Sequence, residues 1–201
     1  MKARPWALVV LLVLGLASPA APQANGEGVP VRVRADYLRF DRARQVVYAR
    51  GNVVVESDDL TLYADEAFLE LETSELAARG NVVLETAGQR VTAAHLTYNF
   101  RTQQGSLDAA ETRWRDPLVR DPVHLRARRM DGNPEQRLCL SEAEVTTCDL
   151  DDPGAPYKLA AREILYLPQD RIVMRDASLY LFGVKVLSLP FFVLFLREPR
   201  Q

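Results

Sequence analysis

Histidine, cysteine and tryptophan are scarce in this chain, since each occurs only twice, and the 25 basic and 27 acidic residues nearly cancel to a formal net charge of −2. The two histidines, His95 and His124, do not form a spacing with the cysteines that is typical of a zinc site. The small net charge also removes the long-range attraction on which binding to nucleic acid depends. We therefore expect no metal, no cofactor and no nucleic-acid partner.

Long uninterrupted apolar runs are also lacking: a short one lies near the start, and the apolar segment over 179–196 is broken by Pro190. Residues 1–4 include the basic Lys2 and Arg4, residues 6–16 are apolar, and mostly small residues follow at 17–20. This order is typical of a secretory signal peptide, and the run is about half of the roughly 20 residues that a membrane-spanning helix needs. An uncleaved anchor is the alternative.

These features predict a domain organisation and a location. We expect a signal peptide over 1–20, a short linker over 21–30, one domain over 31–196 and a polar tail over 197–201. The mature protein is expected in the periplasm, with association with the outer membrane left open.

An internal repeat organises much of the chain. Ala-Asp followed by Ala-Arg-Gly-Asn-Val-Val occurs at 35–54 and returns 29 residues later at 64–83, with weaker copies that begin at Ala93 and Ala161. Such a repeat indicates stacked, similar units. Aligning the copies gives two apolar columns, Leu38/Ala67/Leu96/Ile164 and Phe40/Leu69/Tyr98/Tyr166.

Each unit has the pattern of antiparallel strands. Alternating β-branched and aromatic residues are separated by short polar breaks at 41–45, 72–75, 101–105 and 168–171, which are suited to hairpins. The Gly-Asn pairs of the repeat fit either a hairpin turn or a bulge at which a strand bends. Residues 113–160 contain five prolines and are expected to form longer loops.

The repeat resembles the OstA-like domain family of the lipopolysaccharide transport proteins LptA, LptC and LptD over roughly residues 30–110. The second half resembles the N-terminal periplasmic domain of the LptD branch, in which Thr-Thr-Cys-Asp at 146–149, Ala-Arg-Glu-Ile at 161–164 and Gly183 to Phe192 follow the branch's order of motifs. The fold that the resemblance implies is all-β: a twisted, open β-jellyroll of repeated antiparallel hairpins with an apolar groove between two sheets.

The resemblance implies a non-enzymatic module that binds lipopolysaccharide, shields its acyl chains and helps to deliver it to the outer membrane. In the LptD branch the Leu-Pro-Phe-Phe segment leads into an outer-membrane barrel, whereas this sequence ends at Gln201. We therefore expect the chain to act as a bridge to a separate barrel protein, and to join related OstA-like domains through its unpaired edge strands.

The residues expected to line the groove are the larger members of the two columns together with valines and a leucine of the repeat. They are Leu38, Phe40, Val53, Val55, Leu69, Val82, Leu84, Leu96, Tyr98, Ile164 and Tyr166. The alternative is that these side chains fill a closed core, in which case the protein would be a structural scaffold or adaptor that never binds lipid.

Two further groups of residues are candidates for specific roles. Arg126, Arg128 and Arg129 form a basic cluster that could contact the phosphates of a lipid headgroup, and a solvated strand face is the alternative. Cys139 and Cys148 could form a disulfide in an oxidising compartment, with two free thiols as the alternative. The resemblance adds a third possibility, because some family members bridge this domain to the barrel.

The search for catalytic groups identifies none. No nucleophile motif or phosphate-binding glycine loop occurs, and the acidic cluster at 149–152 fits a polar turn better than a calcium site. A carbohydrate-active enzyme with paired carboxylates is a third, weaker hypothesis.

Overall fold

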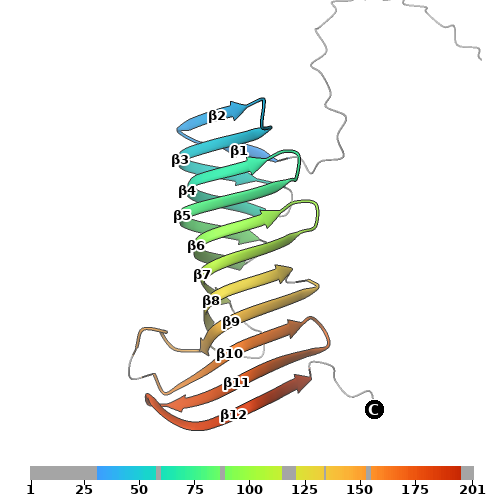
Figure 1. The fold of residues 1–201 in the computed structure, drawn as a ribbon. Coiled ribbons are helices and arrows are strands. Elements are labelled where there is room, and N and C mark those ends of the chain that lie inside the picture. Colours follow the sequence, from blue (N-terminus) through green and yellow to red (C-terminus); the bar gives the residue numbers. More distant parts are fainter. Residues whose placement is uncertain are drawn as a thin grey trace, which may run out of the picture.

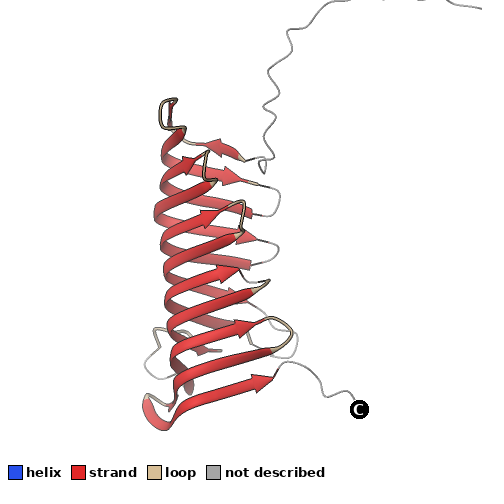
Figure 2. Cartoon of the chain, turned by 45° about the vertical axis from the view of Figure 1, so that its right-hand side comes forward, coloured by secondary structure: helices blue, strands red, loops and turns tan. Residues whose placement is uncertain are grey.

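The chain forms a long, narrow stack of β-strands. The computed structural model describes residues 31–57, 60–86, 89–114, 121–133, 135–152 and 155–195. In these segments the regular structure consists of strands alone (Figure 2). The strands are β1 (Arg32–Arg34), β2 (Tyr37–Asp41), β3 (Val46–Glu56), β4 (Leu60–Glu70), β5 (Glu75–Thr86), β6 (Gln89–Asn99), β7 (Gln104–Trp114), β8 (Val123–Asn133), β9 (Arg137–Thr146), β10 (Tyr157–Leu167), β11 (Arg171–Leu181) and β12 (Val184–Phe195).

The predicted all-β, open jellyroll is confirmed, and its two layers are the two halves of one sheet. Twelve strands form a single antiparallel sheet in which β3 to β12 follow the order of the sequence, while β1 and β2 both pair with β3. The long strands bend near their midpoints, so the sheet folds over on itself along its length (Figure 1). The predicted signal peptide, linker and polar tail lie outside the described residues.

The bends in β3 and β5 explain the repeated Asp, Gly and Asn of the sequence. The pairing register shifts between Arg50 and Val53, which identifies the Gly-Asn pair as a bulge at a corner and not as a hairpin turn. Gly51 has φ +75°, and a Cβ there would lie 2.6 Å from the Asp36 carboxylate, which accepts a 2.8 Å hydrogen bond from the Asn52 amide. Only glycine combines this backbone angle with so close an approach.

The same corner recurs one repeat later and then changes its chemistry. Asn81 donates a 2.9 Å hydrogen bond to Asp65 beside Gly80, as Asn52 does to Asp36. At the corners of β9 and β11 the left-handed positions are occupied by Glu142 and Asp176, which form ion pairs with arginines of the preceding strands. The bend is thus retained along the sheet although the repeat has diverged.

Residues 113–160 contain more strand than the sequence predicts. The expected loops are replaced by β8 and β9 over most of 123–146, and the described prolines in this stretch, Pro122 and Pro156, stand directly before β8 and β10. Proline is tolerated at such a position because no ladder hydrogen bond is lost inside the strand. The expectation of long loops was therefore wrong for these two strands.

Among the described residues, no helix is long and apolar enough to span a membrane.

Candidate lipid-binding interior

The concave face of the folded sheet carries rows of apolar side chains that run across the strands from one end of the molecule to the other. Directly paired residues define each row. The central row is Leu38, Ala49, Ala67, Ala78, Leu96, Leu107, Met130, Leu140, Ile164, Met174 and Phe192. Both ends of this row lie on terminal strands of the sheet, so the row spans the whole stack.

Two further rows follow the rims of the folded sheet, near the strand ends. Lip row 1 is Phe40, Val47, Leu69, Leu76, Tyr98, Gly105, Gly132, Leu138, Tyr166, Ile172 and Leu194. Lip row 2 is Val33, Val55, Leu62, Leu84, Val91, Thr112, Leu125, Val145, Leu159, Leu179 and Leu187. The two columns aligned from the sequence fall into the central row and lip row 1.

Small residues lie beside the corners on the same concave face. Ala110, Ala127 and Ala143 pair directly with one another in β7, β8 and β9 and are buried. Val53 and Val82 occupy the equivalent place in β3 and β5 and pair with alanines of the next strands. Short side chains suit this place because the two halves of each bent strand converge there.

The interior is sealed between the terminal strands, and its apolar side chains are exposed on the strands at both ends. Val53, Val55, Val82 and Leu96 are at most 2% exposed, whereas Leu38 at the β2 end is 52% exposed. At the other end Leu187, Phe192 and Leu194 of β12 are also exposed. The predicted inward direction of Leu38 and Phe40 agrees with their register, although both are exposed because β2 is a terminal strand.

The sequence missed several interior residues of comparable burial. Leu62 and Leu76 are at most 1% exposed, and Leu125, Met130 and Leu140 are also buried. Leu62 could have been found from its alternation with Leu60, whereas Leu125, Met130 and Leu140 lie in the segment expected to form loops. The described interior therefore extends through β8 and β9 without a break in the sheet.

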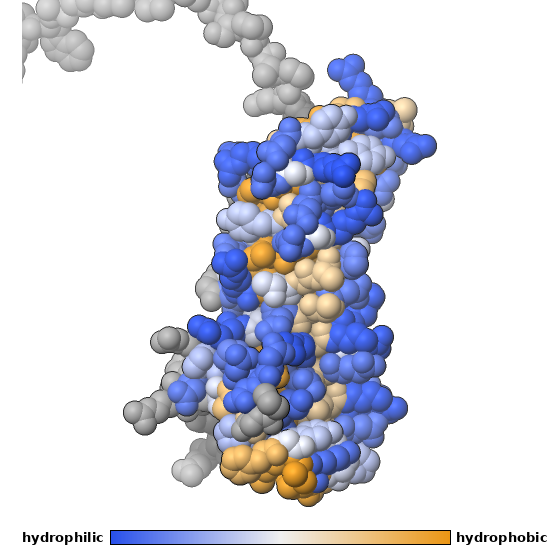
Figure 3. All heavy atoms as spheres, turned by 90° about the vertical axis from the view of Figure 1, so that its left-hand side faces the viewer, coloured by the Kyte–Doolittle hydropathy of each residue, from blue (hydrophilic) through white to orange (hydrophobic). Residues whose placement is uncertain are grey.

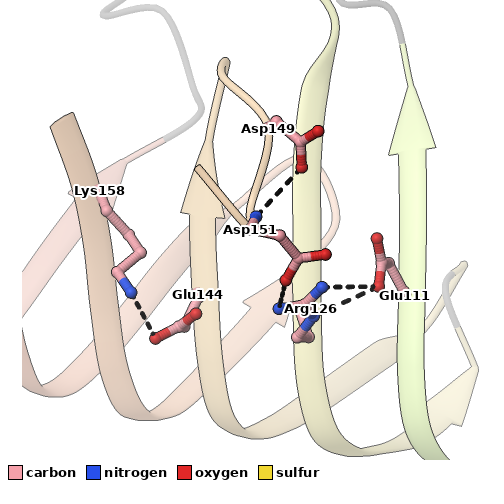
Figure 4. Close-up of polar contacts among 6 residues, drawn as sticks. All are labelled: Glu111, Arg126, Glu144, Asp149, Asp151 and Lys158. Atoms are coloured by element: carbon pink, nitrogen blue, oxygen red, sulfur yellow. Dashed lines mark hydrogen bonds and ion pairs between the residues drawn. The ribbon is translucent and has the colours of Figure 1, made fainter. Parts of the chain in front are cut away.

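The predicted arginine cluster lies on the outer face and is neutralised by carboxylates. Arg126 donates hydrogen bonds to Glu111 and, at 2.9 Å, to Asp151 of the β9–β10 loop (Figure 4). The Asp151 contact lowers the pKa of that carboxyl group and raises the pKa of the Arg126 guanidinium.

The other two arginines of the cluster are paired in the same way. Arg128 pairs with Glu142, and Arg129 pairs with Asp108 and Asp131. The cluster is thus a charge-matched outer surface and not a cationic site beside the interior. Headgroup contact by these three residues would require carboxylate partners to be exchanged for phosphate, and it stays a prediction.

The β9–β10 loop folds over the outer face and covers a shallow cavity of about 200 Å³. The acidic residues of the loop are engaged locally, because Asp149 accepts a hydrogen bond from the Asp151 backbone and Asp151 pairs with Arg126 (Figure 4). Lys158, which also lines the cavity, pairs with Glu144 at 2.9 Å. In the described part of the chain no cluster of three or more histidine, cysteine or acidic side chains is arranged to hold a metal ion.

The two cysteines are not bridged. Both are free thiols, at opposite ends of β9. Cys139 lies near the start of β9, whereas Cys148 lies two residues beyond its end at Thr146. The predicted Cys139–Cys148 disulfide is not formed in this structure.

Cys139 lies on the outer face and is partly buried. Burial is the main cause that raises the pKa of its thiol, and the nearby Glu163 carboxylate, 3.8 Å from the sulfur, raises it further. This environment disfavours the reactive thiolate.

Taken together, these features define an elongated, single-sheet β-jellyroll with an apolar interior whose side chains are exposed on the strands at both ends of the stack.

Comparison with known proteins relates this chain to one group. No family model matches it. It is 30% identical over 162 residues to the LPS-assembly protein LptD of Acinetobacter baumannii, and the match covers 80% of this chain and 19% of that protein. It is also 30% identical over 172 residues to LptD of Aromatoleum aromaticum, covering 78% of this chain and 21% of the relative. The chain thus spans about a fifth of the length of these curated relatives.

Among solved structures, one match is the crystal structure of LptH, the LptA homologous periplasmic component of the lipopolysaccharide transport device of Pseudomonas aeruginosa. The TM-score is 0.29 at 16% sequence identity, with 69% of this chain and 76% of that chain covered. The sequence matches to LptD confirm the resemblance to the OstA-like family of lipopolysaccharide transport proteins.

Proposed function

We propose that this chain is a periplasmic module that binds lipopolysaccharide, shields its acyl chains and passes the lipid towards the outer membrane. The observation that carries the proposal is the set of in-register apolar rows that runs from β2 to β12. The relatives support it, because they are LPS-assembly proteins. The proposal includes no catalytic step.

The physical requirement for carriage is that the acyl chain stays covered. Each methylene exposed to water costs about 0.8 kcal/mol, or roughly 10 kcal/mol for a chain of about a dozen carbons. Repeated rows of similar side chains across the strands would give a lipid similar energies at successive positions. A lipid could therefore move along the stack without a deep trap.

The two ends of the sheet suit strand addition by partner proteins. β2 and β12 are terminal strands, and such edges recruit other strands through main-chain hydrogen bonds. In addition, β12 carries apolar side chains on both faces. Phe192 belongs to the central row on the concave face, and Phe191, which pairs with Arg175, lies on the outer face. Figure 3 shows apolar surface gathered at this end of the molecule.

We propose that related OstA-like domains and an outer-membrane barrel protein occupy these edges. A protein partner fits β12 better than lipid hydrocarbon does, since the unpaired backbone groups of an edge strand would remain unsatisfied in a bilayer core.

A structural scaffold that pairs by its edges without binding lipid is the second candidate. The sealed middle of the interior favours it, because Val55 and Leu62 are fully buried and leave the rows in contact with one another. The two functions differ in whether a lipid ever contacts the interior rows.

Photo-crosslinking in lipopolysaccharide-producing cells separates them. A benzophenone amino acid at Leu69 or Tyr98 reports on the interior, and the matched control is Thr97, which is adjacent on β6 but faces outward and is exposed. The exposed Glu72 is a second control. Lipopolysaccharide adducts at the interior positions alone support carriage, whereas a folded chain that gives none at any position supports the scaffold.

A further inference from the structure

The hairpin between β11 and β12 ends in a turn whose sequence does not suit its backbone. Its two central residues, Phe182 and Gly183, have positive φ angles of +50° and +78°, and the flanking Leu181 and Val184 pair directly with each other. A two-residue turn of this kind is usually built from asparagine or aspartate followed by glycine. A bulky residue in the left-handed region is strained, because its Cβ crowds the backbone. Phe182 therefore occupies a position that disfavours it.

The fold itself does little to offset this strain. Phe182 is 73% exposed, more than any other large apolar residue in the described segments. At four other turns of the sheet, the residue with positive φ is polar: Gln45, Ser74, Gln103 and Gln169. Strained residues that local packing does not reward are concentrated at functional sites. The position of Phe182 therefore points to a contact outside this chain.

Phe182 belongs to a group of exposed apolar side chains at the end of the hairpin. We call this group the apolar tip: Leu181, Phe182, Val184 and Val186. It lies at the end of the molecule where apolar surface is gathered (Figure 3). The whole segment 177–195 contains one charged residue, Lys185, and no acidic residue. Protein interfaces usually surround an apolar centre with a polar rim, which this hairpin does not supply.

Amphipathic side chains lie beside and just behind the apolar tip. Tyr157 pairs directly with Leu181, and Tyr180 pairs with Lys185. The Tyr157 hydroxyl donates a 2.8 Å hydrogen bond to the Thr147 hydroxyl. Tyrosine and lysine combine an apolar body with a polar end, which suits the headgroup level of a bilayer. The order from the tip inwards is therefore that of a membrane interface, with apolar side chains first and tyrosine and lysine next.

The turn can enter a bilayer interface without leaving its own backbone unpaired. Leu181 and Val184 are paired across the hairpin, and the Phe182 N–H donates a 3.2 Å hydrogen bond to the Pro156 carbonyl oxygen. An edge strand in the hydrocarbon core would leave a row of such groups unsatisfied, whereas a tip that reaches only the headgroup–acyl boundary does not. Docking by the tip thus leaves the rest of the β12 edge to a protein partner.

The charges near the tip indicate which bilayer surface fits it. Gly183 of the turn lines the shallow outer cavity together with Asp149, Asp151 and Asp152. Carboxylates at this place do not attract an anionic surface. A zwitterionic surface does not oppose them, so a contact there would depend on apolar area and not on charge.

We propose that the apolar tip docks on the surface of a zwitterionic phospholipid bilayer, with the Phe182 ring at the headgroup–acyl boundary. This inference goes beyond the proposed carriage of lipopolysaccharide, because it concerns the outside of the molecule and requires no lipid in the interior. The contact directs the β12 end of the stack towards a membrane.

The test is flotation of the full chain, exported and purified from cells, with vesicles of phosphatidylethanolamine and phosphatidylcholine. We expect the unmodified chain to float equally well at low and high salt, because an apolar contact is not screened by ions. Phe182→Asn should lower the partition coefficient about tenfold, since it removes the largest apolar side chain of the tip. The same variant should be at least as stable in urea, because asparagine suits the turn. Val184→Thr, which keeps the side-chain shape, should lower the partition coefficient several-fold.

The matched control is Phe191→Thr, because Phe191 is also an exposed phenylalanine of β12 but pairs with Arg175 on the far side of the corner at Asp176. We expect this variant to float as the unmodified chain does. An equal loss for Phe191→Thr, unchanged flotation of Phe182→Asn, or loss of binding at high salt overturns docking by the tip. A Phe182→Asn chain that is less stable than the parent overturns the argument from strain. An unmodified chain that does not float overturns the proposal and leaves lipid carriage to the separate adduct test at Leu69.

Discussion

Replacing Gly80 with alanine tests the account of the corners most directly. Gly80 has φ +75°, and an alanine there would carry a left-handed strain of roughly 1–2 kcal/mol. Its Cβ would also lie 2.9 Å from the Asp65 Cβ, so the Asp65 side chain would have to move and give up its hydrogen bond from Asn81. That bond is exposed and contributes about 1–2 kcal/mol at most. We expect a total loss of about 2–4 kcal/mol.

The assay is urea unfolding followed by circular dichroism, applied as a double-mutant cycle with Asp65→Ala. In the Asp65→Ala background the carboxylate and its hydrogen bond are absent and only the 2.9 Å approach of the two Cβ atoms remains, so Gly80→Ala should lose less than in the parent, mainly the backbone term of roughly 1–2 kcal/mol. Gly51→Ala, at the preceding copy of the corner, should behave as Gly80→Ala does because Asp36 lies in the same relation to it. A Gly80→Ala variant as stable as the parent, or one with the same loss in both backgrounds, would refute the reasoning.

Two further predictions concern the outer face. Arg126→Met should raise the pKa of Asp151 towards its ordinary value, as measured by carboxyl NMR titration. In the unmodified protein the folded-state pKa of Asp151 is lowered, so its contact with Arg126 stabilises the fold above the ordinary aspartate pKa. That stabilisation is lost as the pH falls through the lowered pKa. An unchanged Asp151 titration would contradict this pairing. Glu163→Gln should lower the pKa of the Cys139 thiol and speed its alkylation by iodoacetamide at pH 8. The alkylation rate at Cys148 is the internal control. Equal acceleration at both thiols would indicate that the substitution loosens the fold and would contradict the prediction.

The strand architecture and the interior columns could be predicted because both are local in the sequence. The repeat places Leu69 and Tyr98 at equivalent positions, and the register brings them into one row with Leu76 between them. Alternation along a strand then determines which face a side chain occupies. These features need no knowledge of distant contacts.

The roles of the charged and sulfur-containing residues could not be predicted, because they depend on pairing between strands. Arg126 appeared to be one of a cluster of unpaired arginines, since Glu111 and Asp151 lie 15 and 25 residues away and become neighbours only in the folded sheet. The spacing of Cys139 and Cys148 suited a bridge across a hairpin, but Cys139 lies within β9 and Cys148 lies beyond its end, so the two cysteines do not face each other across paired strands.

The sealed middle of the interior and a role in lipid carriage are compatible because of how the sheet is built. Each strand pairs only with its neighbours in the stack, and the two rims approach each other through side chains and not through a hydrogen-bonded ladder. Moving the rims apart would therefore break side-chain contacts and leave the backbone ladders intact, with the bend taken up at the corners. An acyl chain that replaced the contacts between the lip rows would regain much of the apolar burial lost on opening, since hydrophobic stabilisation depends on area removed from water and not on which apolar group covers it. A fixed, permanently open groove would instead leave both lip rows exposed to water whenever no lipid was bound.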